Sequence, residues 1–281
     1  MSDLVRPAAG VRAGWVSVGG TSVRCFERAG DGPTILLVHG GGAHSAWWFE
    51  SMRHFAERRV VAFDLSGHGD SARRDAYRVA DWADEIEAVI RTRGRERVTL
   101  VSHSMGGRAG AVLAARAPKL LRSAIFIDSV LPTHDAEPMP PVTPPRIYST
   151  RAEAVSRFRL SPPSGHTPQT TIDFLADASV VATEGGWTWK FDPRVFGMLD
   201  PERVNEAIPR IATPVGLVLA RESPVTKIED TEAFMALLGR PVPVRVLGDV
   251  GHHPMLDDPE LTARTILEFA TELEGIATQA R

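Results

Sequence analysis

The stretch Val98-Thr-Leu-Val-Ser-His-Ser-Met-Gly-Gly-Arg108 decides how this chain folds. Its first four residues are apolar or β-branched, which is the pattern of a buried strand. Two glycines follow soon after, and the small residues from Ala109 to Ala117 predict a helix that ends before Pro118. A strand and a helix that follow each other so closely require a sharp turn, and Ser104 lies at its corner.

Strands and helices alternate on both sides of this stretch. Residues 14–28 alternate in polarity around a Gly-Gly turn, which predicts a hairpin. Apolar runs that predict further strands lie at 33–40, 59–64, 121–127, 215–219 and 242–247. The alternation predicts an α/β fold with a mostly parallel, doubly wound sheet and an N-terminal antiparallel hairpin.

Several polar residues fall where these strands end. In a parallel sheet, catalytic and binding residues lie beyond the carboxyl ends of the strands. The residues at such ends are His39, Ser104, Asp128, Glu222 and His252. Because the carboxyl ends of parallel strands share one edge of the sheet, we expect the functional site among these residues.

The alternation stops between residues 131 and 209. This part of the chain is rich in proline, has helical patterns near 151–160 and 170–183, and then carries an aromatic cluster. This pattern predicts an insertion rather than a continuation of the sheet. We predict a core domain formed by residues 1–130 and 210–281, and a mainly helical cap formed by residues 131–209.

Composition excludes several classes of protein. The 281 residues have a formal net charge of −3, so no positive surplus points to nucleic acid or to an anionic membrane. The single cysteine excludes an internal disulfide, and no apolar run has the length of a membrane span or a signal peptide. These features predict a cytoplasmic protein without nucleic-acid or membrane partners, and they leave its oligomeric state open.

Four motifs follow one another along the chain. They are His39-Gly-Gly-Gly42, Asp64-x-x-Gly-x-Gly-x-Ser71, Ser102-x-Ser-x-Gly106 and Gly251-His252. In this order the chain resembles the α/β-hydrolase fold superfamily over nearly its whole length, in the branch that holds esterases, epoxide hydrolases and dehalogenases. One position departs from the G-x-S-x-G pattern of the serine motif, because Ser102 stands where the first glycine is expected.

The resemblance implies a nucleophile and a base. Ser104 occupies the nucleophile position, and His252 occupies the position of the histidine that takes its proton. His253 is the weaker candidate for the base, because consecutive side chains in a loop point apart.

The resemblance also implies an oxyanion hole, which needs two backbone N–H groups aimed at the developing negative charge. The residue after the nucleophile supplies one of them, here Met105. The loop after the first His-Gly supplies the other, which is Gly41 with Gly42 as the alternative.

The acid that orients the histidine has two candidates. The family usually places an aspartate after the penultimate strand, where this chain has Ser223 or Pro224 instead, with Glu222 one or two positions early. Dehalogenase-like enzymes place the acid at the end of the strand that follows the nucleophile helix, and Asp128 stands there. We therefore favour Asp128 and keep Glu222 as the alternative.

A serine nucleophile narrows the reaction to acyl transfer, because dehalogenases and epoxide hydrolases of this fold use aspartate. We predict a Ser-His-Asp esterase that acts on a small carboxylic ester, lactone or thioester, with no cofactor and no metal. His44, Trp47 and Trp187 are candidates for the substrate pocket. A carbon–carbon-bond hydrolase, a lyase, an acyltransferase or a non-catalytic ligand receptor are the alternatives.

Overall fold

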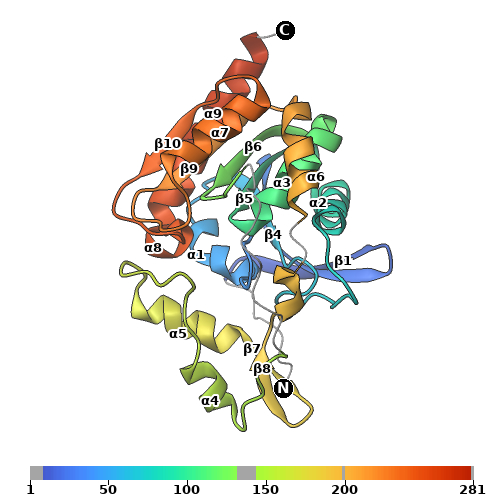
Figure 1. The fold of residues 1–281 in the computed structure, drawn as a ribbon, viewed down its shortest axis with the longest axis vertical. Coiled ribbons are helices and arrows are strands. Elements are labelled where there is room, and N and C mark those ends of the chain that lie inside the picture. The colour runs from blue at the N-terminus through green and yellow to red at the C-terminus, as the bar shows by residue number, and fades with distance from the viewer. Residues whose placement is uncertain (1–8, 132–143, 198–199, 280–281) are drawn as a thin grey trace.

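An eight-stranded sheet forms the centre of the protein (Figure 1). The computed structural model describes residues 9–131, 144–197 and 200–279. In spatial order the strands are β1 (Val11–Val18), β2 (Thr21–Arg28), β4 (Arg58–Phe63), β3 (Gly32–Val38), β5 (Val98–His103), β6 (Leu121–Ile127), β9 (Val215–Ala220) and β10 (Val244–Leu247). Strands β1, β2 and β4 pair antiparallel, and every other neighbour pairs parallel. The predicted fold class is confirmed.

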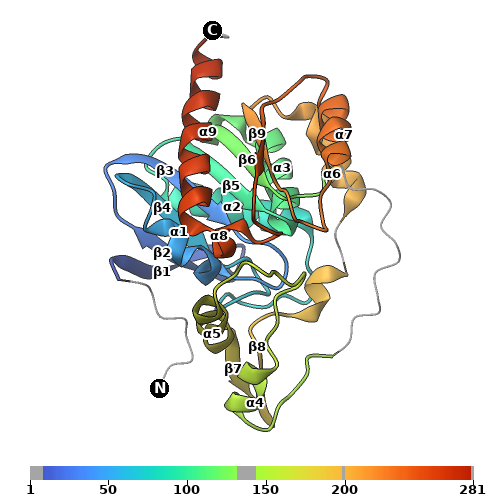
Figure 2. The ribbon, with the colours of Figure 1, turned by 90° about the vertical axis from the view of Figure 1, so that its left-hand side faces the viewer.

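Helices cover both faces of the sheet, as Figures 1 and 2 show. One face packs against α2 (Val79–Arg93), α3 (Met105–Arg116), α6 (Pro201–Ala207) and α7 (Ile228–Leu238). The other face packs against α1 (Phe49–Met52), α8 (Pro254–Asp257) and α9 (Pro259–Gln279). The described 3₁₀ turns are η1 (Ser45–Trp48), η2 (Pro118–Leu120), η3 (Pro193–Phe196) and η4 (Ile208–Arg210).

The period of two along a strand explains why the central strands carry apolar residues at consecutive positions. In β3, Leu36 and Val38 face the layer that contains α2 and α3, whereas Ile35 and Leu37 face the layer that contains α9. Both sets are buried, so apolar residues predominate on both faces. The continuous apolar pattern of the sequence is thus a consequence of two covered faces.

Residues 144–197 lie beside the core, at the foot of Figure 1. They form α4 (Arg151–Ser156), α5 (Gln169–Ala178), the paired strands β7 (Val180–Thr183) and β8 (Gly186–Trp189), and η3. The predicted helical pattern at 170–183 therefore ends early. β-branched residues and a Glu184-Gly185 turn, with Gly185 at positive φ, favour a hairpin from Val180 onward. Residues 132–143 of the predicted insertion lie outside the described residues.

The end of the predicted insertion packs with the core. Val204 and Ala207 of α6 and Ile208 of η4 belong to the apolar cluster that includes α3. Their spacing of three and four residues gives this short helix one apolar face. Residues 201–209 thus form part of the layer that covers the sheet, although the sequence pattern groups them with the cap.

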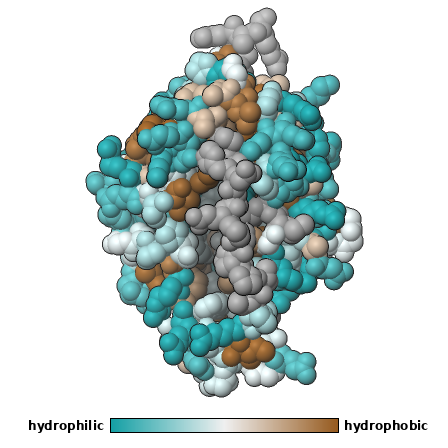
Figure 3. Space-filling model, in the orientation of Figure 1, coloured by the Kyte–Doolittle hydropathy of each residue, from teal (hydrophilic) through white to brown (hydrophobic). Residues whose placement is uncertain are grey.

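The surface is mixed in character. Hydrophilic side chains cover most of the described surface seen in Figure 3, and apolar ones form separate patches. Scattered exposed apolar residues are normal on a folded protein. None of the described helices is both long enough and apolar enough to cross a lipid bilayer.

Candidate active site

Ser104 lies in a strained turn between β5 and α3. Strand β5 ends at His103 and α3 begins at Met105, so a single residue reverses the chain. Its backbone angles are φ 50° and ψ −125°, a conformation that a residue with a side chain rarely adopts. The cost of this conformation is offset by the packing on either side, and the turn presents the Ser104 hydroxyl at the edge of the sheet.

Glycines allow this turn to pack closely. A Cβ atom at Gly106 would lie 2.3 Å from the carbonyl oxygen of His39, so only glycine fits there. A Cβ atom at Gly110 would lie 2.6 Å from the Ser102 hydroxyl. The glycine missing at position 102 of the motif is thus matched by a glycine on the facing helix, which makes room for the Ser102 side chain.

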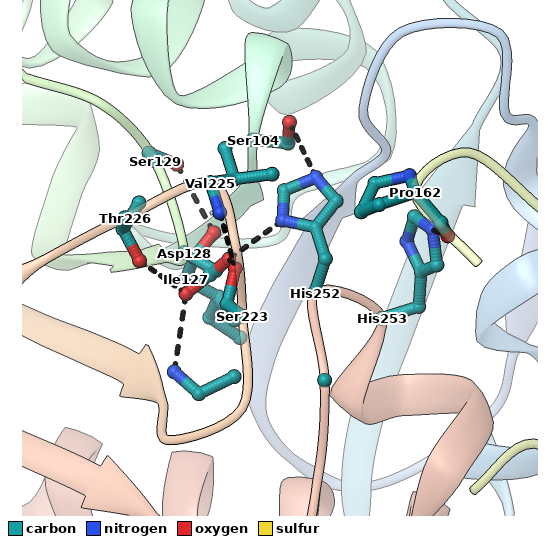
Figure 4. A network of polar contacts seen from close by, with 12 residues as sticks. Ser104, Ile127, Asp128, Ser129, Pro162, Ser223, Val225, Thr226, His252 and His253 are labelled. Atoms are coloured by element: carbon teal, nitrogen blue, oxygen red, sulfur yellow. Dashed lines mark hydrogen bonds and ion pairs between the residues drawn. The ribbon is translucent and has the colours of Figure 1, made fainter. Parts of the chain in front are cut away.

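His252 joins Ser104 to Asp128 (Figure 4). Its Nε2 lies 3.0 Å from Ser104 Oγ, and its Nδ1 lies 2.6 Å from Asp128 Oδ2. The carboxylate can only accept, so it holds the proton on Nδ1 and leaves Nε2 free to accept from the serine hydroxyl. The arrangement pairs a nucleophile with a base and orients that base.

Asp128 is held from several sides. It follows β6 at a positive φ of 46° and is fully buried. Besides His252, its carboxylate accepts hydrogen bonds from the Ala220 N–H and from the hydroxyls of Ser223 and Thr226. Ser223 or Pro224 stands where the sequence pattern places the acid, and here the Ser223 hydroxyl donates to Asp128 instead.

Glu222 points elsewhere. Its carboxylate lies 2.7 Å from His166 Nε2, and nearly half of its side chain is exposed. The hydrogen bond with Glu222 raises the pKa of His166. The structure brings Asp128, and not Glu222, to His252.

A cavity of about 510 Å³ opens beside Ser104 and His252, within the range of small-ligand sites. Gly41, Gly42 and Met105 line it together with Ser104. Met105 is the first residue of α3, so its N–H has no acceptor within the helix. The residues predicted for an oxyanion hole therefore border the same space as the serine hydroxyl.

The pocket candidates separate into two groups. His44 and Trp47 line the cavity, and His44 Nε2 lies 2.9 Å from Ser179 Oγ of the cap. Trp187 does not line the cavity, so the prediction that it belongs to the substrate pocket is wrong. It lies on the same face of β8 as Trp189 but two residues nearer the hairpin turn, and only Trp189 reaches the cavity.

Comparison with known proteins identifies the family of the chain. The family model described as "Alpha/beta hydrolase family" matches residues 35–265. The chain belongs to the α/β-hydrolase family. Among solved structures, a thioesterase domain from the curacin biosynthetic pathway is 23% identical, with a TM-score of 0.78, and the match covers 92% of this chain and 99% of that domain. At this identity the likeness establishes the fold alone.

Two curated relatives match a shorter stretch of this α/β hydrolase. An uncharacterised protein from Mycobacterium tuberculosis is 39% identical over 108 residues, which are 38% of this chain and 32% of that protein. The 2-(acetamidomethylene)succinate hydrolase of Mesorhizobium japonicum is 36% identical over 115 residues, which are 40% of this chain and 41% of that enzyme. The matches thus span a third to two fifths of the relatives' length.

Three histidines of the hydrolase cluster beside the serine. Ring nitrogens of His103, His252 and His253 lie within 4.8 Å of one another, although their sequence spacing gives no metal motif. Both ring nitrogens of His252 are already engaged, and one nitrogen each of His103 and His253 contacts the carbonyl of His252 or Pro162. Burial lowers the pKa of His253 to about 4. Burial also lowers the pKa of His103, so the imidazoles next to the base are neutral.

Some residues of the site escaped the sequence analysis. Ser223 and Thr226 are ordinary loop residues in the sequence, and only the fold turns their hydroxyls toward Asp128. Trp189 belongs to the aromatic cluster, but nothing in the pattern distinguishes it from Trp187. Arg108 lines the cavity, and its position one turn after Ser104 is a signal that was available in the sequence.

Proposed function

We propose that this α/β hydrolase is a serine esterase that cleaves a carboxylic ester, lactone or thioester through an acyl-enzyme. One observation carries the proposal. A serine in a strained turn, a histidine and a fully buried aspartate are joined by contacts of 3.0 and 2.6 Å at the wall of a cavity. The hydrolase named above and other matched proteins, among them a methylesterase of Arabidopsis thaliana, support hydrolysis as the class of reaction.

Each group has a role in the proposed reaction. Ser104 attacks the carbonyl carbon while His252 takes its proton, and Asp128 stabilises the imidazolium that forms. The N–H groups of Met105 and Gly41, with Gly42 as the alternative, stabilise the tetrahedral oxyanion. His252 then gives the proton to the leaving group, and in the second half it activates the water that cleaves the acyl-enzyme.

Hydrolysis of a p-nitrophenyl ester series from acetate to octanoate tests the proposal. We expect turnover by the native chain and a loss of about 10⁴-fold or more in Ser104→Ala. The chain-length preference then gives the size of the acyl pocket.

Ser102→Ala is the matched control. It removes a hydroxyl from β5, the strand that leads to Ser104, and this buried hydroxyl has no hydrogen-bond partner among the described residues. Activity close to that of the native chain is expected. Folded native protein that neither hydrolyses any ester of the series nor reacts with a fluorophosphonate probe would overturn the esterase proposal and favour a ligand receptor.

A further inference from the structure

The cavity beside Ser104 is lined by cations that have no matching carboxylate in its wall. Among the described residues that line it, Arg108, Arg159 and Lys190 carry charge, and none is an aspartate or a glutamate. Lys190 Nζ lies 2.6 Å from Asp70 Oδ1 behind the wall. Arg159 donates from Nη1 to two backbone carbonyls of its own segment. Both of these cations are therefore already engaged.

Arg108 is different. It is partly buried on α3, and within the described part of the chain no carboxylate and no hydrogen-bond acceptor contacts its guanidinium. Burial lowers its pKa, and no carboxylate in the described part of the chain opposes the shift. Arg194 shows the contrast, because its pKa is raised by Asp192. Arg240 is also partly buried, but it donates to the carbonyls of Ile211 and Thr213.

The position of Arg108 in the helix makes its unpaired charge less favourable still. It lies one turn after Ser104, near the positive end of the dipole of α3, where a cation is unfavourable. A guanidinium that is partly removed from water without a partner costs further free energy. An anion bound in the cavity would offset both costs. The planar fork of arginine fits a carboxylate with two parallel hydrogen bonds.

We propose that Arg108 is a specificity-determining residue that binds a carboxylate carried by the substrate. The inference rests on the proposed esterase function and names its substrate class: esters that bear a free carboxylate a few atoms from the scissile carbonyl. Ser104 directly precedes α3, Arg108 is the fourth residue of that helix, and both line the same cavity. A short ester can therefore span Ser104 and the guanidinium at the same time.

Two pairs of esters test the proposal, each pair matched in shape. Monomethyl glutarate and methyl 5-methylhexanoate differ by a carboxylate or an isopropyl group on the acyl side. 4-Acetoxybutanoate and 4-methylpentyl acetate differ in the same way on the alcohol side. For at least one pair we expect about tenfold or greater preference in kcat/KM for the charged member, mainly through KM. The pair that shows it identifies the side of the ester that Arg108 contacts.

Substitutions assign the preference to one residue. Arg108→Gln is expected to lower kcat/KM of the charged ester about tenfold or more relative to its neutral partner and so to remove the preference, and Arg108→Lys is expected to retain part of it. Arg116→Gln is the matched control, because it removes a cation from the same helix that pairs with Asp84 and Glu87 at the surface. The control should behave as the native chain.

Failure of the proposed role of Arg108 can be distinguished from failure of the proposed esterase function. Ser104-dependent hydrolysis without any preference for the charged esters, or an equal loss on both members of each pair in Arg108→Gln, would overturn the role of Arg108 and leave the esterase intact. If no ester is hydrolysed, calorimetric binding of monomethyl glutarate to Ser104→Ala decides the matter. Binding that weakens about tenfold on adding Arg108→Gln supports carboxylate recognition without esterase activity, and absence of binding overturns it.

Discussion

The core and the cap each supply one half of the site, and they hold their residues in different ways. In the core, Asp128 is fully buried and its carboxylate accepts from a backbone N–H, two hydroxyls and His252. Residues 144–197 are joined to the core by contacts spread along their length: apolar packing of Leu160 and Leu175, a backbone hydrogen bond from the Asp192 N–H to the Gly67 carbonyl, and the ion pair of Lys190 with Asp70. The catalytic acid is thus fixed by one dense local network, whereas the cap is held by many contacts that lie far from one another.

This difference between core and cap indicates that catalytic geometry and substrate selection can change independently. Catalytic geometry requires positions fixed to a fraction of an ångström, which a packed sheet edge and its short loops provide. Substrate selection requires a pocket wall that differs between related enzymes. A segment outside the sheet, such as residues 144–197, can provide that wall. Changes in the core network should therefore remove activity, and changes at the attachment points should alter stability and substrate affinity.

The strongest test compares the two acidic residues. Asp128→Asn keeps the shape of the side chain but removes the charge that stabilises protonated His252, so we expect kcat to fall by about 10⁴-fold. Glu222→Gln changes a half-exposed residue that contacts His166, and we expect less than a twofold effect. Steady-state hydrolysis of a p-nitrophenyl ester by both variants gives the comparison. Near-native activity of Asp128→Asn together with an inactive Glu222→Gln would reverse the assignment.

A buried ion pair is one of the contacts that attach the cap to the core. The side chains of Lys190 and Asp70 are only 3% and 2% exposed, and they join β8's end to the loop after β4. Lys190→Met leaves the Asp70 carboxylate buried without its cation, which should lower the free energy of unfolding by about 3–5 kcal/mol. Urea unfolding measures the loss.

An exposed ion pair within the cap supplies the control. Arg151→Met breaks the pair with Asp177 at the surface and should cost less than about 1 kcal/mol. A Lys190→Met and Asp70→Leu double variant should recover much of the stability lost in the single variant. Equal effects of Lys190→Met and Arg151→Met would contradict the importance of the buried pair.

The core should also dominate the pH dependence of stability. Burial lowers the pKa of His39 to about 4, of His44 to about 3 and of His253 to about 4, so these side chains stay neutral in the folded state. Below about pH 6.5 these histidines bind protons in the unfolded chain but not in the folded chain. Their contribution to the free energy of unfolding therefore falls as the pH falls from 6.5 toward 4. Each histidine contributes about 2 kcal/mol between pH 7 and pH 5.

Two carboxyl groups oppose this trend. Burial raises the pKa of Asp64 to about 6 and raises that of Glu85, so both favour the folded state as the pH falls. We still expect a net loss of stability at pH 5 relative to pH 7, measured by thermal unfolding. His166→Gln changes an exposed histidine of the cap and should alter the slope least. Equal or greater stability at pH 5 would show that the carboxyl groups outweigh the histidines.

Substitutions at two glycines test how closely the core and the cap are packed. Gly106→Ala places a Cβ atom 2.3 Å from a backbone oxygen, so the turn after Ser104 must shift, at a cost of about 1–3 kcal/mol in unfolding free energy. Gly165→Ala in the cap meets no atom within 4 Å and should change stability by less than about 0.5 kcal/mol. Chemical denaturation of both variants tests the contrast, and similar stabilities would argue against close packing at the turn.

Much of the fold and part of the site were predictable from local pattern. The serine turn, the parallel strands and the N-terminal hairpin follow from apolar runs and glycine positions that act over a few residues. The cap was less predictable, because its short segments have weak periodicity and the β-branched run from Val180 competes with a helical pattern. The placement of α6 was missed because its apolar face is too short to show which layer it packs against.

The sequence by itself determined which residues stand at the carboxyl ends of the strands, since strand and turn patterns are local. It could not decide between Asp128 and Glu222 as partner of His252, because both follow strands on the same edge. Only the tertiary structure made that choice, through the course of the loop after β9, which turns Ser223 and Thr226 toward Asp128 and Glu222 toward His166. The path of a loop depends on contacts between residues far apart in the chain, and no local pattern records them.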